Sequence, residues 1–193
     1  MTNSTKETNN YSAQQSYDNL VAELDEAITQ AAAHHANRLQ CRPGCSHCCK
    51  PFSVLAVESS SMQEALAKLD KATRTKIAEA AKKNPEQCPF LQEDLCAIYH
   101  HRPLICRTQG LAIAYINHEQ EAIEVSACPI NFPEDEEFPF TEQDLLFMDQ
   151  FNDQLAAINH DFCTKKGLHP EERTPFALIS QPTPHTKHTE PND

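Results

Sequence analysis

The feature that most restricts what this chain can fold into is a short segment with four of its nine cysteines. The segment is Cys41-Arg-Pro-Gly-Cys45-Ser-His-Cys48-Cys49. Pro43 and Gly44 favour a tight turn, which lets several sulfur atoms point toward one place. A loop so rich in thiols has three chemical uses: it binds metal, forms disulfides or carries out redox chemistry.

Four further cysteines, Cys88, Cys96, Cys106 and Cys128, follow in the middle of the chain, and Cys163 stands apart nearer the C-terminus. Without Cys163, the four further cysteines and the four of the loop supply eight thiols, enough for two sites of four thiolates each. Soft thiolate ligands select zinc, Cu(I) or iron–sulfur clusters over hard cations such as magnesium. The choice of metal is therefore narrow.

Composition predicts the compartment and excludes some partners. Residues 1–19 are polar and lack the basic start and apolar run of a signal peptide. No stretch reaches the ~18 consecutive apolar residues of a membrane span. We therefore expect a cytoplasmic protein without membrane contact, where clustered cysteines favour metal binding or catalysis over disulfides. The net charge of −12 argues against direct binding to nucleic acid, and nothing in the sequence indicates a protein partner.

The spacing of apolar residues predicts one helix-dominated α+β domain over residues 16–168, with disordered ends at 1–15 and 169–193. A small antiparallel sheet and a cysteine-rich, metal-binding middle complete it, and metal crosslinks would contribute to its folding. Helices are expected at 16–39, 61–69, 73–83 and 141–166. Strands are expected at 52–57, 111–116 and 122–126, the last two as a hairpin.

The cysteine spacing is compatible with both zinc and an iron–sulfur cluster. Zinc takes four ligands in a tetrahedron, and a half-site of two cysteines separated by two to four residues is usual. Cys41 with Cys45, or Cys45 with Cys48, satisfies that spacing. Adjacent side chains of an extended backbone point to opposite faces, so Cys48 and Cys49 are expected to serve different metals or different corners of a cluster. A compact loop plus a remote cysteine also suits a cluster, and metal-free thiol redox chemistry is a third alternative.

Three motifs in order resemble the YkgJ-type cysteine cluster family (CxxCxxCC), whose members are described as zinc- or iron-chelating domains. They are the 41–49 loop, the segment from Cys88-Pro-Phe-Leu to Cys106-Arg, and Cys128-Pro. The resemblance covers residues 41–129 and implies metal binding. The ligands that it implies are the eight matching cysteines: Cys41, Cys45, Cys48, Cys49, Cys88, Cys96, Cys106 and Cys128.

Other residues near these cysteines are weaker candidates. Arg102 and Arg107 flank Cys106 within the resembling segment, and we predict that they bind the cofactor by offsetting the negative charge of its thiolates. The alternative for both is an ordinary surface ion pair. His47 lies in the loop as a secondary ligand candidate. Cys163 falls outside the motifs and is expected to be a small buried hydrophobe.

Two functions fit these observations. The first is a metal-binding protein that chelates zinc or iron, the iron as an ion or in an iron–sulfur cluster. The second is an iron–sulfur enzyme with redox or methyl-transfer chemistry, the latter implied by a distant similarity to flagellin lysine methylases. The loop also resembles that of radical S-adenosylmethionine enzymes, but the repeated strand–helix pattern of their barrel is absent from this sequence. No catalytic residue can be named, since no Ser-His-Asp order or HExxH motif is present.

Overall fold

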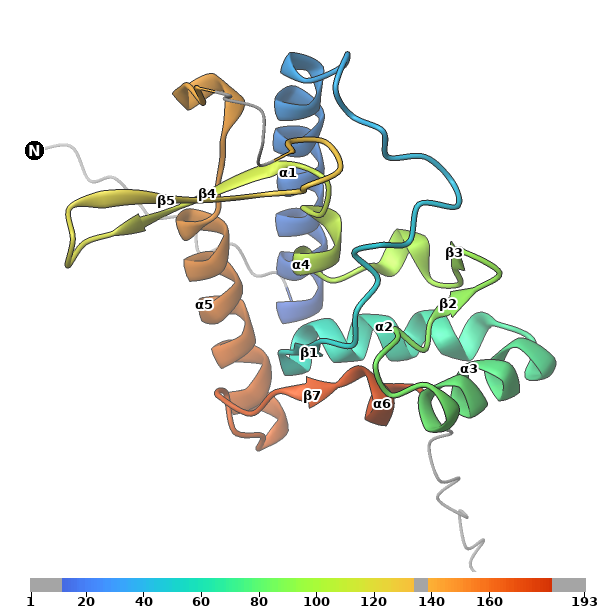
Figure 1. The fold of residues 1–193 in the computed structure, drawn as a ribbon. Helices are drawn as coiled ribbons and strands as arrows, with labels where there is room; N and C mark the ends of the chain where they lie inside the picture. The colour runs from blue at the N-terminus through green and yellow to red at the C-terminus, as the bar shows by residue number, and fades with distance from the viewer. Residues whose placement is uncertain (1–11, 134–138, 182–193) are drawn as a thin grey trace, which may run out of the picture.

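The computed structural model describes residues 12–133 and 139–181, which form a helix-dominated α+β domain (Figure 1). Its helices are α1 (Ala13–His34), α2 (Ala56–Lys68), α3 (Lys71–Lys83), η1 (Tyr99–His101), α4 (Leu104–Arg107), η2 (Glu142–Asp144), α5 (Asp149–Lys166) and α6 (Phe176–Ile179). Its strands are β1 (Ser53–Val54), β2 (Leu91–Gln92), β3 (Leu95–Cys96), β4 (Ala112–Asn117), β5 (Ala122–Ala127), β6 (Leu146–Phe147) and β7 (Thr174–Pro175). The expected fold class is confirmed.

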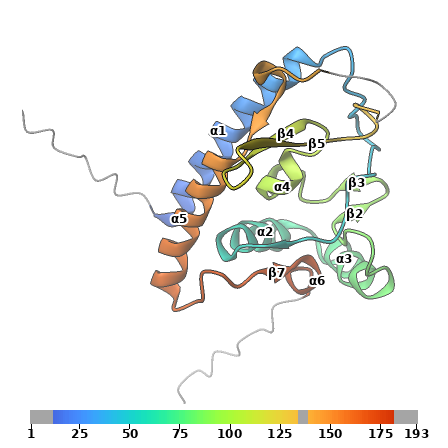
Figure 2. The ribbon, with the colours of Figure 1, turned by 60° about the vertical axis from the view of Figure 1, so that its left-hand side comes forward.

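The two long helices, α1 and α5, lie side by side and carry the larger apolar core (Figures 1 and 2). Leu20 and Leu24 of α1 and Phe162 of α5 are among its buried residues. We call this group of residues the first core. Helix α1 begins earlier than position 16, because Ser12 and Gln15 form a capping box in which each side chain accepts the other residue's backbone N–H.

The stretch 52–57, expected to be a strand, is a strand only at Ser53–Val54, and α2 begins at Ala56. The cause is Glu58, whose carboxylate accepts the backbone N–H of Leu55 at 3.1 Å and caps the helix. The same carboxylate accepts the N–H of Leu104 at 3.1 Å, which links α2 to α4. Burial raises the pKa of Glu58. The helix start that the sequence predicted at residue 61 therefore lies inside α2, which begins at Ala56.

Strands β4 and β5 form the expected hairpin, with Ala112 opposite Ala127 and Asn117 opposite Ala122. The hairpin extends outward from the helical body in Figure 1. Strand β6 adds to β4 in parallel, so the largest sheet is mixed in the order β5-β4-β6. Thr141 and Asp144 were expected to cap the final long helix, but they cap η2, and α5 begins only at Asp149.

A second core lies below the first, between α2, α3 and the end of the described chain. Val54, Met62, Ile77 and Phe90 are buried in it together with Phe176 of α6. The sequence analysis ended the domain at residue 168, whereas β7 pairs with β1 and α6 packs into this core. The physical reason is the burial of Phe176 and Ile179, which begin and end the short apolar run Phe-Ala-Leu-Ile.

The expected end of α3 at residues 83–84 and that of α5 before Gly167 are both confirmed. Gly167 has a φ of +65°, the left-handed conformation that glycine readily adopts after a helix. Residues 1–11 and 182–193, expected to be disordered, lie outside the described residues, as does the whole acidic run 134–137. Among the described helices, none combines the length and apolar character needed to cross a bilayer.

Candidate metal centre

The cysteine loop joins α1 to β1 and contains no helix or strand. Its first turn is closed by the N–H of Cys45, which donates to the carbonyl of Arg42 at 2.9 Å, with Gly44 at a φ of +93°. A second turn is closed by the N–H of Cys49, which donates to the carbonyl of Ser46 at 3.0 Å. The predicted tight turn is therefore present, and it is followed at once by another.

The adjacent thiols of Cys48 and Cys49 are hydrogen-bonded to each other, but they lie in different surroundings. Cys49 packs against the second core, whereas Cys48 lines a cavity. The Cys48 thiol donates, and this bond raises the pKa of Cys48 and lowers that of Cys49. Cys48 and Cys49 thus lie at the boundary between two sets of thiols, which are described next.

The first set, which we call the buried thiol group, consists of Cys49, Cys88, Cys96 and Cys106. Cys88 is buried in the second core, and the other three pack against that core. The N–H of Cys88 donates to the carbonyl of Cys49 at 3.3 Å. Cys96 lies on β3 opposite Leu91 of β2, in a two-stranded hairpin that follows Cys88 closely. Segments 40 to 60 residues apart are thereby brought together.

Electrostatics at Cys88, Cys96 and Cys106 of the buried thiol group favour neutral thiols in the metal-free protein. Burial raises the pKa of Cys88 to about 11, and it raises the pKa values of Cys96 and Cys106 as well. The negative charges of Cys88 and Cys96 raise the pKa of Cys106 further. Metal binding to these residues must therefore displace protons.

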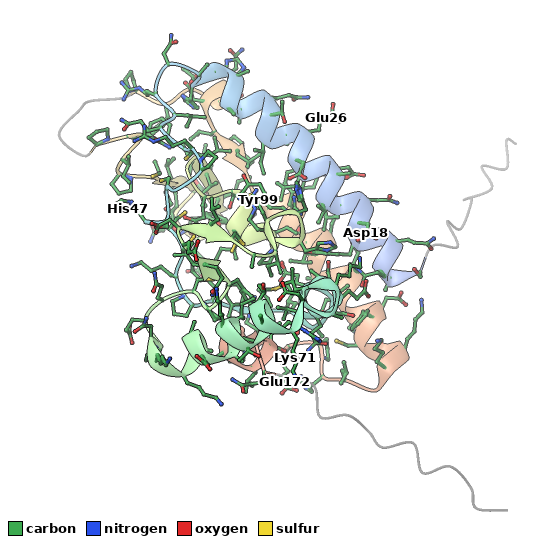
Figure 3. All side chains as sticks on the ribbon, turned by 90° about the vertical axis from the view of Figure 1, so that its right-hand side faces the viewer. Asp18, Glu26, His47, Lys71, Tyr99 and Glu172 are labelled. Carbon is green, nitrogen blue, oxygen red and sulfur yellow. The ribbon has the colours of Figure 1, made fainter. Side chains whose placement is uncertain are left out.

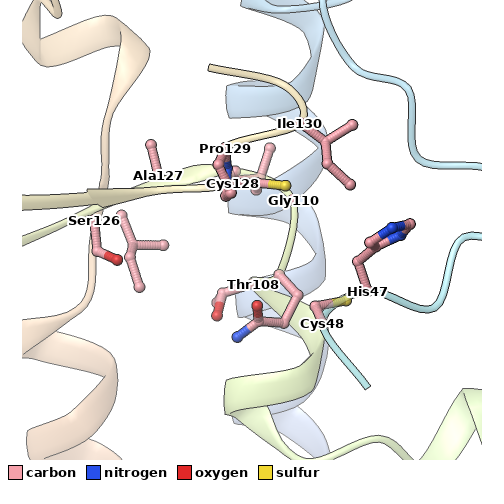
Figure 4. A pocket seen from close by; sticks show the side chains of 12 residues that line it. His47, Cys48, Thr108, Gly110, Ser126, Ala127, Cys128, Pro129 and Ile130 are labelled. Carbon is pink, nitrogen blue, oxygen red and sulfur yellow. The ribbon is translucent and has the colours of Figure 1, made fainter. Parts of the chain in front are cut away.

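The second set, the cavity thiol group, consists of Cys41, Cys48 and Cys128. Cys48 and Cys128 line a cavity of about 360 Å³ together with His47 and Gly110. In Figure 4, Cys128 reaches it from the end of β5 and Cys48 from the cysteine loop. His47 lies on the side of the molecule away from Asp18 and Glu26 of α1 (Figure 3). The cavity is therefore remote from that surface of the long helix.

Cys41 is held against Gly110, beside the same cavity. A Cβ atom added to Gly110 would lie 2.5 Å from the Cys41 sulfur, so a side chain at this position would displace the thiol. Asn131, only 2% exposed, donates from Nδ2 to the Gly110 carbonyl at 2.6 Å and to the Cys41 sulfur at 3.4 Å. Its Oδ1 accepts the N–H of Gln40 at 2.9 Å. Gly110 and Asn131 thus form the seat of Cys41.

The sequence analysis missed this seat. Its only local signals were an asparagine three residues after Cys128, where the N–H of Asn131 donates to the Cys128 carbonyl at 3.0 Å, and a single glycine at position 110.

The two remaining cysteines, Cys45 and Cys163, belong to neither thiol group. Cys45 ends the first turn of the loop and is partly exposed, whereas Cys163 is fully buried in the first core, as expected.

The two arginines flanking Cys106 have different surroundings. The charge of Arg102 lowers the pKa values of Cys48, Cys96 and Cys106, although larger effects outweigh it, and its guanidinium lies 3.8 Å from the ring centre of Tyr99. Arg107 points toward α1, where its Nη1 donates to both carboxylate oxygens of Asp25 at 2.7 and 2.9 Å. Arg102 therefore supplies positive charge near the thiols, and the buried Arg107 forms an ion pair with the half-exposed Asp25.

Within residues 12–133 and 139–181, no three His, Cys, Asp or Glu side chains are already arranged to hold a metal ion. The donor set nevertheless fits a soft metal, because it contains seven thiols in two neighbouring groups and an eighth, Cys45, in the loop between them. Zinc–sulfur bonds measure about 2.3 Å, so ligation requires side chains of each group to turn toward a common point. The loop backbone around Cys41–Cys49 contains no helix or strand that would oppose such adjustment.

A comparison with protein families matches residues 40–129 to the model of the CxxCxxCC family, described as a "Putative zinc- or iron-chelating domain". Residues 40–129 are similar to a CxxCxxCC domain. The domain begins one residue before Cys41 and ends one residue after Cys128, so it includes both thiol groups and leaves out Cys163. The match to the CxxCxxCC domain indicates a metal ion as the binding partner. No curated protein and no solved structure matches the chain significantly.

Proposed function

We propose that this protein binds zinc or iron through the thiolates of its CxxCxxCC domain. The ligands are the eight cysteines of the two thiol groups and the loop between them: Cys41, Cys45, Cys48, Cys49, Cys88, Cys96, Cys106 and Cys128. The observation that carries the proposal is the packing of Cys49 with Cys88, Cys96 and Cys106, which come from distant parts of the chain. These four thiols equal in number the ligands of a tetrahedral four-sulfur zinc site and of a four-cysteine iron–sulfur cluster, and ligation requires their side chains to turn toward a common point.

Arg102 has a supporting role in this proposal. Several thiolates around one metal carry a net negative charge, which a neighbouring guanidinium offsets. Arg102 is placed for this function, since its charge lowers the pKa of three of the thiols. Arg107 acts indirectly, because its bonds to Asp25 and to the carbonyls of His100 and Arg102 hold the backbone around Cys106.

The cytoplasm is the compartment that we propose for this activity. All nine cysteines are free, as a reducing environment requires for thiolate ligands. The net charge of −12 disfavours nucleic acid as a direct partner.

An iron–sulfur enzyme with redox or methyl-transfer chemistry is the second candidate. It is favoured by the cavity of about 360 Å³ beside Cys48 and Cys128, because an enzyme needs space for a small molecule next to its metal. A purely structural metal site would have no use for this space.

The deciding experiment is anaerobic purification of the protein without added metal, followed by counting iron, zinc and acid-labile sulfide per chain. Zinc alone supports the chelating function, and iron with an equal amount of sulfide supports a cluster. The matched control is the Cys163→Ser variant, which should retain the metal of the wild type because Cys163 lies in the first core. A folded protein that contains no metal and takes up none from Zn²⁺ or Fe²⁺ would contradict the proposal.

A further inference from the structure

We propose that the thiols form two separate metal sites of unequal accessibility. The buried thiol group holds one ion that exchanges slowly, and the cavity thiol group holds a second ion that exchanges readily with solution. The inference rests on the proposed metal binding and goes further, because it assigns each cysteine to a site and gives the two sites different behaviour. The ligand of the second site is a soft divalent cation such as Zn²⁺ or Fe²⁺.

The assignment of the thiols to two sites rests on the different surroundings of Cys48 and Cys49. These neighbours lie at the boundary between the second core and the cavity, one facing each. Cys49 shares the second core with Cys88, Cys96 and Cys106, which makes four thiols. That number completes a tetrahedral site, so the buried thiol group needs no ligand from the cavity.

The remaining thiols lie around the cavity. Cys48 and Cys128 both line it (Figure 4). Cys41 lies against Gly110, which is part of the cavity wall. Cys45 precedes Cys48 by three residues, the separation of a zinc half-site, and we assign it to this group as the fourth ligand. Two sets of four thiolates then account for all eight cysteines of the domain.

The seat of Cys41 has the features of a built site. A glycine at position 110 leaves room for the sulfur, which any Cβ there would displace. The buried amide of Asn131 donates to that sulfur, and N–H donors of this kind orient and stabilise thiolate ligands around metals. The same amide binds the Gly110 carbonyl, so the sulfur and its seat are positioned together.

Exposure explains the expected difference in exchange. Cys88 is 9% exposed within the second core, and Cys49, Cys96 and Cys106 are partly exposed beside it, whereas Cys41 is exposed and Cys48 and Cys128 are partly exposed beside an open cavity. A chelator can approach the cavity thiols directly. It reaches Cys88 only after the second core opens, and such local opening costs free energy, so an ion bound through Cys88 should exchange more slowly.

The test uses Co²⁺ as the probe, because thiolate-bound Co²⁺ has a strong charge-transfer absorption that reports sulfur ligation. The full chain, stripped of metal and reduced, is titrated anaerobically, and bound Co²⁺ is counted per chain. We expect two ions in the wild type. Cys128→Ser and Gly110→Ala should each retain only the slowly exchanging ion, whereas Cys96→Ser should retain only the rapidly exchanging one.

Gly167→Ala is the matched control for Gly110→Ala. Both glycines have a positive φ, but a Cβ at Gly167 meets no atom within 4 Å, so this variant should keep both ions. Circular dichroism verifies that each variant is folded. If Cys96→Ser does not fold, the wild type still decides, because chelator removal should proceed in two phases whose rates differ by about tenfold or more.

One bound ion per chain, lost equally from Cys128→Ser and Cys96→Ser, would overturn the two-site inference and leave the proposed metal binding intact. A single phase of removal from the wild type would overturn it as well. A wild-type protein that binds no Co²⁺, Zn²⁺ or Fe²⁺ would contradict the proposed function itself. The two failures are therefore distinguishable.

Discussion

The two cores of this protein differ in their relation to the cysteines of the candidate metal centre. The first core lies between two long helices, α1 and α5, and its side chains are mainly aliphatic and aromatic, with Cys163 as a buried member. The second core lies between α2 and α3 and several strands of two residues, and the thiols of the buried thiol group pack in it or against it. Short strands provide few backbone hydrogen bonds. We therefore expect metal bound to these thiols to stabilise the second core more than the first.

The largest contrast should come from matched truncations, one in each core. Phe90→Ala removes a ring that is 1% exposed in the second core, and it should cost about 3–5 kcal/mol of unfolding free energy. Because Phe90 lies two residues from Cys88 and its carbonyl accepts the N–H of Ala97, next to Cys96, the variant should also bind Zn²⁺ more weakly. Urea unfolding with and without Zn²⁺ measures both effects.

Leu24→Ala is the counterpart in the first core, where Leu24 is fully buried. It should cost about 2–5 kcal/mol with or without metal and leave Zn²⁺ affinity unchanged. Equal losses of Zn²⁺ affinity in both variants would show that the two cores respond to metal as one unit.

The second contrast depends on pH and concerns the buried thiol group. The pKa of Cys88 is about 11 and those of Cys96 and Cys106 are also raised, so these three thiols are protonated at neutral pH without metal. Each must lose its proton to bind metal, so affinity should rise about tenfold per pH unit for each thiol, or about a thousandfold for the three. Zn²⁺ affinity measured at pH 6, 7 and 8 tests this sign, and a flat profile would contradict it.

A third contrast separates the arginines on either side of Cys106. Arg107→Gln breaks the ion pair with Asp25 and the bonds to two backbone carbonyls, and should cost about 2 kcal/mol of stability. Arg102→Gln should have a small effect on stability but should reduce metal retention several-fold, because its charge acts on the thiols. Thermal unfolding and metal content distinguish the two variants. A larger loss of stability in Arg102→Gln together with a larger loss of metal in Arg107→Gln would contradict the roles assigned to the two arginines.

The smallest expected effect lies at the start of the first core. Ser12→Ala removes the side-chain cap of α1 and should cost about 1 kcal/mol, independently of metal. Thr29→Ala is the control on the same helix, since its hydroxyl only donates back to the Asp25 carbonyl and alanine favours helices. Chemical denaturation should detect the first change and little of the second.

Local patterns in the sequence predicted those elements whose causes are local. The β4–β5 hairpin follows from two apolar runs around a polar turn, and the end of α3 follows from the proline after Asn84. The start of α2 was misplaced because the cap of that helix is Glu58, a buried carboxylate that also binds Leu104 far along the chain. Strand β6 was missed because its parallel partner is more than 30 residues away.

The candidate metal centre shows the same division. The eight cysteines and their family resemblance were evident from spacing, because ligand chemistry depends on residue type and local separation. The seat of Cys41 was not, since Gly110 and Asn131 lie about 70 and 90 residues further along and neither belongs to a periodic pattern.

Residue types and short-range order predicted a class of soft metals for this chain, because thiolate ligands favour zinc, Cu(I) and iron–sulfur clusters over hard cations. Which thiol faces which surroundings was settled only by the folded chain. Cys48 and Cys49 are neighbours with the same chemistry, yet packing turns one toward a cavity and the other toward the second core. The difference arises from contacts between segments far apart in sequence, which no local pattern encodes.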